Sequence, residues 1–129
     1  MSNPNVELVR KIFEEMLEGN FQLYFESVTD DLSYTAIGST AVSGTVRGRD
    51  ENFARYAKVL EALEGPIKLT PDNVFGEGDF VALQGHGQAR TKTGLDYNNI
   101  YCLVFRFRDG KIAEVTEYLD TELLRAALG

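Results

Sequence analysis

The second half of the sequence constrains the fold most, because long stretches of alternating residues are separated there by short turns. We predict strands at Ile67–Phe75, Phe80–Arg90, Tyr97–Arg108 and Lys111–Leu119. The turns between them are short and rich in Gly and Asp, as in Asp109–Gly110. Consecutive strands joined by tight turns pair antiparallel, so this half predicts a meander.

The first half is dominated by helical patterns. Apolar residues recur at helical spacing in Pro4–Leu17 and Asp50–Glu64, and a shorter helix is predicted at Phe21–Ser27. Leu32–Ile37 alternates as a strand, whereas Gly38–Gly48 is rich in Gly, Ser and Thr and favours a loop or short hairpin. Helices followed by hairpins predict an α+β fold whose helices pack on one face of an antiparallel sheet.

Length and charge narrow the class of protein. The 129 residues predict one domain, 1–129. A net charge of -7 argues against a nucleic-acid partner, and no apolar run is long enough for a membrane span. The single cysteine, Cys102, and the absence of a signal-peptide pattern predict a cytoplasmic protein. With one histidine and no phosphate-binding loop, no metal or cofactor is expected.

The two faces of the third long strand differ in composition. Tyr101, Leu103 and neighbouring aromatic residues share one face, which we expect to point towards the helices and a cavity. Ile100, Cys102 and Val104 share the other face, although a face open to water should be polar. We therefore predict a homodimer through this outer face, with an exposed apolar patch as the alternative.

Polar groups on the flanking strands supply the candidate chemistry. Glu117 shares a face with apolar neighbours, where a carboxylate is costly unless it is paired, hydrogen-bonded or protonated. On the second long strand Gln84 and His86 lie on one side, and Gly85 and Gly87 on the other. Alternation along this strand does not decide which side faces inward.

The run Tyr97–Ile112, with Glu117–Thr121 and Gly44–Asp50, resembles the SnoaL-like and ketosteroid-isomerase-like proteins of the nuclear transport factor 2-like superfamily. The resemblance implies a cystatin-like cone, in which a curved antiparallel sheet wraps around N-terminal helices. It also implies a small apolar ligand in the cavity. Members of this superfamily isomerise, cyclise or hydrolyse small molecules, or only bind and dimerise, so the resemblance marks the fold better than the reaction.

Two known reactions of the superfamily can be compared with these residues. Both acids of ketosteroid isomerase are missing, since Thr35–Ser39 holds no carboxylate and the second acid matches Leu103. Similarity to limonene epoxide hydrolase places Gln84, His86 and Glu117 at its motif positions, with changed residue types. This register implies that the side of the strand bearing Gln84 and His86 faces inward.

We therefore predict that His86 and Glu117 meet inside the cavity and transfer protons to a substrate with a carbonyl, enol or epoxide oxygen. The predicted substrate-binding residues are Tyr34, Gln84, Asn99, Tyr101, Tyr56 and Leu103. Simpler interpretations remain open, because a tyrosine such as Tyr56 also fills core positions and His86 could be a structural residue of the wall. The alternative function is a non-catalytic ligand-binding or dimerisation module.

Overall fold

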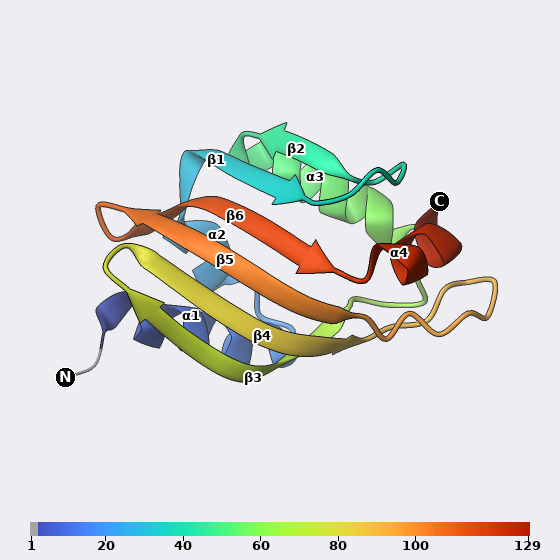
Figure 1. The fold of residues 1–129 in the computed structure, drawn as a ribbon, viewed down its shortest axis with the longest axis horizontal. Coiled ribbons are helices and arrows are strands. Elements are labelled where there is room, and N and C mark those ends of the chain that lie inside the picture. The colour runs from blue at the N-terminus through green and yellow to red at the C-terminus, as the bar shows by residue number, and fades with distance from the viewer. Residues whose placement is uncertain (1–2) are drawn as a thin grey trace.

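The helices lie on one side of a curved sheet, which is the cystatin-like arrangement of nuclear transport factor 2-like proteins (Figure 1). The computed structural model describes residues 3–129, so the first two residues of the predicted domain lie outside it. The helices are α1 (Pro4–Leu17), α2 (Gln22–Ser27), α3 (Arg49–Leu60) and α4 (Thr121–Leu128). The strands are β1 (Val28–Ala36), β2 (Gly44–Arg47), β3 (Lys68–Glu77), β4 (Phe80–Gln88), β5 (Ile100–Arg108) and β6 (Lys111–Leu119).

The sheet has six strands in the order β2-β1-β6-β5-β4-β3. The predicted meander is confirmed, since β3 to β6 pair antiparallel in chain order. One pairing differs from the fully antiparallel sheet that we predicted, because β1 runs parallel to β6. A parallel pair needs a long connection. Here α3 and the meander provide it, and they bring the first and last long strands side by side at the centre of the sheet.

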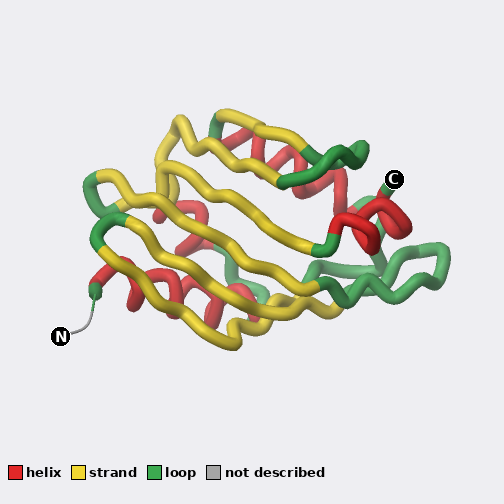
Figure 2. The backbone as a smooth tube through the Cα atoms, viewed as in Figure 1, coloured by secondary structure: helices red, strands yellow, loops and turns green. Residues whose placement is uncertain are grey.

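Some element boundaries differ from the predicted ones. The third helix ends at Leu60 rather than Glu64, because Leu63 turns away and forms a β-bridge with Thr91. The Gly38–Gly48 segment contains a short strand, β2, which forms a hairpin with β1. The loops that follow β1 and β4 gather with α4 at one end of the sheet (Figure 2).

The core lies between α1 and the inner face of the sheet. Asn3 caps α1 by accepting hydrogen bonds from the backbone N–H groups of the first turn. The helix buries Val9, Ile12 and Phe13, and the Phe13 ring meets the edge of Phe105 at 6.0 Å between centroids. No helix in residues 3–129 is long and apolar enough to cross a membrane.

Candidate functional site

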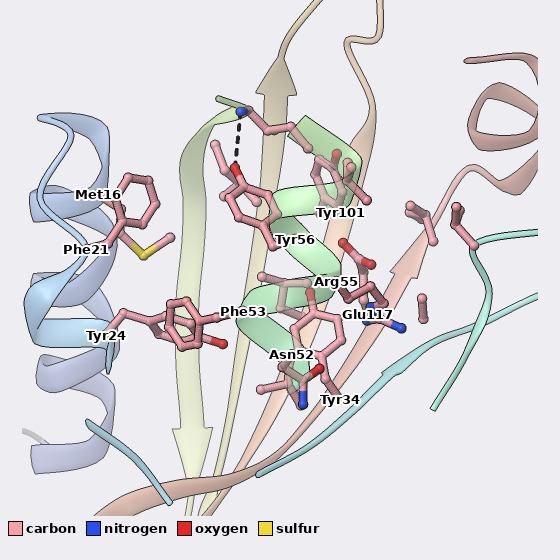
Figure 3. Close-up of a pocket in the computed structure, with 18 of the residues that line it drawn as sticks. Met16, Phe21, Tyr24, Tyr34, Asn52, Phe53, Arg55, Tyr56, Tyr101 and Glu117 are labelled. Carbon is pink, nitrogen blue, oxygen red and sulfur yellow. Dashed lines mark hydrogen bonds between the residues drawn. The ribbon is translucent and has the colours of Figure 1, made fainter. Parts of the chain in front are cut away.

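A cavity of about 210 Å³ lies between the inner face of the sheet and the four helices (Figure 3). Most of its wall is aromatic or aliphatic. Apart from tyrosines, the ionisable residues among its lining are Glu117 from β6 and Arg55 from α3. An apolar cavity with a few convergent polar groups is the usual form of a small-molecule site. The cavity is therefore the candidate functional site.

Glu117 faces the cavity, as the alternation along β6 predicted, and β6 is one of the two central strands of the sheet. The register places it opposite Leu103 on β5 and Ala36 on β1. Burial raises the pKa of its carboxyl group from 4.5 to about 6, although the Arg55 charge and the Tyr34 hydroxyl lower it. A carboxyl group with such a pKa can give or take a proton near neutral pH.

Tyrosine hydroxyls line the cavity near this carboxylate. Burial raises the pKa of Tyr24, Tyr34 and Tyr101, so these hydroxyls stay protonated and can donate hydrogen bonds. The Tyr101 hydroxyl is buried and has no hydrogen-bond partner in residues 3–129. The Tyr56 hydroxyl accepts a 3.4 Å hydrogen bond from the Ile67 N–H group and keeps its proton free (Figure 3). The cavity thus offers several donors to a ligand oxygen.

Sequence reasoning missed Arg55. Its side chain lies on the same side of the cavity as Tyr34 and Glu117, and its guanidinium group lies 5.2 Å from the centre of the Tyr34 ring (Figure 3). A signal was available, because Asn52, Arg55 and Val59 share one helical face at i, i+3 and i+7, and all three line the cavity. The apolar pattern that predicts this helix leaves out a charged residue such as Arg55, although its apolar neighbours Phe53 and Tyr56 also line the cavity.

Tyr34, Tyr56, Tyr101 and Leu103 all line the cavity, as predicted. Asn99 does not. Its amide donates to the Tyr97 hydroxyl and the Asp120 carbonyl, and its oxygen accepts from the N–H groups of Ile100 and Asp120. Because these bonds occupy its polar atoms and hold the start of α4, the placement of Asn99 in the substrate site is wrong.

The predicted meeting of His86 and Glu117 is also wrong. His86 and Gln84 lie on the outer face of β4 and are exposed. His86 Nδ1 lies 2.9 Å from Oδ2 of Asp72, which is the extra residue of a β-bulge in β3. Gln84 accepts a hydrogen bond from Asn73. The opposite face of β4 is buried instead, so the register taken from epoxide hydrolases does not hold for this strand.

The physical reason lies in the glycines of β4. A Cβ atom on Gly87 would lie 2.9 Å from Cε2 of Tyr101, and one on Gly85 would lie 2.7 Å from the Thr70 carbonyl oxygen. The missing side chains leave room for Tyr101 to pack against the strand. A strand face that carries two glycines looks weakly apolar in the sequence, although it faces the core.

A family model for the SnoaL-like domain matches residues 9–115, which is most of the chain. The chain belongs to the SnoaL-like domain family. The match includes most of the cavity wall, but it ends before Glu117 and α4. What this SnoaL-like cavity can do chemically is therefore inferred from its own residues.

Solved structures agree with the SnoaL-like fold. The chain is 20% identical to an NTF2-like protein of unknown function from Burkholderia pseudomallei K96243, with a TM-score of 0.86 and coverage of 99% of this chain and 100% of the other. A Xanthomonas campestris protein of unknown function with a cystatin-like fold is 21% identical, with a TM-score of 0.87 and coverage of 97% of this chain and 98% of the other. A candidate SnoaL-like polyketide cyclase from Jannaschia sp. CCS1 is 20% identical, with a TM-score of 0.80 and coverage of 97% of this chain and 91% of the other. A comparison with functionally curated proteins finds no match.

Proposed function

We propose that this SnoaL-like protein is a cofactor-independent isomerase or cyclase for a small, mostly apolar substrate that carries a carbonyl or enol oxygen. One observation carries the proposal. A single carboxyl group, Glu117, lies in an aromatic cavity that raises its pKa to about 6, beside tyrosine hydroxyls. An epoxide substrate has less support, because no second carboxylate of residues 3–129 lines this cavity.

The proposed chemistry begins with proton removal. Ionised Glu117 takes a proton from the carbon beside the substrate carbonyl, and the electron pair of that C–H bond moves onto the carbonyl oxygen. A hydrogen bond from the Tyr101 hydroxyl, which has no hydrogen-bond partner in residues 3–129, stabilises the enolate that forms. Return of the proton to another carbon completes an isomerisation. Attack of the enolate carbon on a second carbonyl of the same molecule instead closes a ring, and the alkoxide that forms takes the proton back from Glu117.

Deuterium exchange tests this proposal without knowledge of the natural substrate. Apolar cyclic ketones such as 2-tetralone are incubated in D₂O, and the loss of the proton beside the carbonyl is followed by NMR. We expect the wild type to accelerate exchange at least about tenfold over buffer, and Glu117→Gln to lose that acceleration. Tyr101→Phe should slow exchange without abolishing it. His86→Gln is the matched control and should exchange as the wild type does.

Exchange by Glu117→Gln at the wild-type rate would refute the role of Glu117. A different outcome would favour the alternative function. If the ketones shift cavity resonances in the NMR spectrum but exchange no faster than in buffer, the protein is better described as a ligand-binding module.

We also propose that the outer face of the sheet is a homodimer interface. Large apolar side chains are exposed there on adjacent strands, with Ile100 65%, Phe80 53% and Tyr118 47% exposed. Cys102 and Val104 continue the patch along β5 and are partly exposed. A second copy would remove this patch from water by pairing it with itself.

A further inference from the structure

A second hollow of about 330 Å³ lies against the wall of the SnoaL-like cavity. It is formed by the segment 41–46, which includes the start of β2, and by one side of α3. Four residues line both spaces, namely Val42, Arg55, Val59 and Leu128. The two spaces therefore adjoin, and Arg55 borders both. We call them the inner cavity and the outer hollow.

The outer hollow is positive in a protein that is otherwise acidic. Among residues 3–129, Arg55 and Lys58 are the charged side chains that line it, and the Gly129 carbonyl oxygen accepts a hydrogen bond from the N–H group of Ala41, which also lines it. The whole chain carries 20 acidic and 13 basic residues. Residues three apart on a helix lie on one face, so these two cations are adjacent on α3. Such a local excess of positive charge attracts anions even when the net charge of the protein is negative.

Neither cation forms a salt bridge with the described part of the chain. Within residues 3–129, Arg55 and Lys58 form no salt bridge within 4.0 Å, although arginines elsewhere, such as Arg49 and Arg108, pair with aspartates. Arg55 is partly buried and contacts the face of Tyr34 instead. Its guanidinium donors make no hydrogen bond to the described part of the chain and therefore remain available to a ligand.

We propose that the ligand of this SnoaL-like protein is an amphipathic organic carboxylate. Its apolar body fills the inner cavity, and its carboxylate lies in the outer hollow between Arg55 and Lys58. This inference rests on the proposed small-molecule function of the inner cavity and adds the chemical class of the substrate. Arg55 and Lys58 act here as specificity-determining residues, separate from the proton transfer assigned to Glu117.

The proposal also accounts for the absence of a salt bridge between Arg55 and Glu117. Arg55 affects the Glu117 carboxyl group through its charge, yet no salt bridge joins the two groups. An ion pair between them would use up both the base and the anion-binding group. A bound carboxylate beside Arg55 would offset its positive charge, which would make Glu117 a stronger base.

Two ligands of equal shape test the inference. We would measure the binding of 2-naphthylacetate and of its neutral analogue 2-naphthylacetamide by calorimetry, at low salt and again at about 0.3 M salt. We expect the carboxylate to bind at least about tenfold more tightly at low salt, and this preference to shrink at high salt. Lys58→Glu should reduce the preference about tenfold and leave amide binding unchanged. The matched control, Lys11→Glu on the exposed side of α1, changes the net charge equally and should preserve the preference.

Each result decides between the two proposals. Equal binding of the two ligands, or a preference that survives Lys58→Glu, overturns the carboxylate inference and leaves the proton-transfer proposal standing. If neither ligand binds, the carboxylate inference fails, whereas the proton-transfer proposal is decided separately by the deuterium exchange of 2-tetralone. Loss of deuterium exchange in Glu117→Gln with an unchanged preference for the carboxylate supports both.

Discussion

Replacing Glu117 by glutamine should stabilise the protein at neutral pH. The folded state raises the pKa of this carboxyl group from 4.5 to about 6, chiefly by burial. The unfolded chain therefore ionises more readily than the folded one as the pH rises through this range, and ionisation favours unfolding. Stability from this group is present below a pH of about 4.5 and is lost as the pH rises through about 6.

The magnitude follows from the shift in pKa. Each pKa unit corresponds to about 1.4 kcal/mol, so a rise from 4.5 to about 6 removes roughly 2 kcal/mol of unfolding free energy at neutral pH. Glutamine has nearly the same shape and no charge. The difference in unfolding free energy between Glu117→Gln and the wild type should therefore grow by about 2 kcal/mol between pH of about 4 and about 7.5.

Urea denaturation followed by circular dichroism measures this difference at each pH. The comparison of the two proteins cancels the titration of all other groups, provided that their slopes with urea agree. Glu114→Gln, on the same strand but exposed, is the matched control and should show no comparable pH-dependent gain. A difference that stays constant across this range would show that Glu117 is not desolvated, and the reasoning behind its catalytic role would be wrong.

Three further predictions follow from the packing. Gly87→Ala places a methyl group 2.9 Å from Cε2 of Tyr101 and should cost about 1–3 kcal/mol of stability, measured by urea denaturation. Asn99→Leu leaves the buried backbone groups of Asp120, at the start of α4, without their hydrogen-bond partners. It should therefore destabilise the protein by about 2–4 kcal/mol and speed amide hydrogen exchange in α4. Unchanged exchange in α4 would contradict the structural role of Asn99. Val104→Lys on the outer face should convert the proposed dimer to a monomer in sedimentation experiments, and a wild type that is monomeric at micromolar concentration would exclude the dimer.

The local patterns that predicted the fold are those that depend on neighbouring residues alone. The turn at Asp109–Gly110 and the alternation along β5 predicted a hairpin whose inner face carries Tyr101 and Leu103, and the structure confirms both. The inward position of Glu117 followed from the same alternation. Such patterns are reliable because successive side chains on a strand point to opposite faces. Each assignment therefore needs only one strand and a clear contrast between its two faces.

The tertiary structure decided those features of the site that depend on contacts between different helices and strands. Alternation separated the two sides of β4, but only the packing of Tyr101 against Gly87 shows that His86 faces outward. The charge that acts on Glu117 likewise comes from a distant helix, because the parallel pairing of β1 with β6 and the placement of α3 bring both Arg55 and Glu117 to the cavity wall. Sequence fixes which residues share a face of one element. Which face is buried, and which side chains meet across the cavity, depend on contacts between segments far apart in the chain.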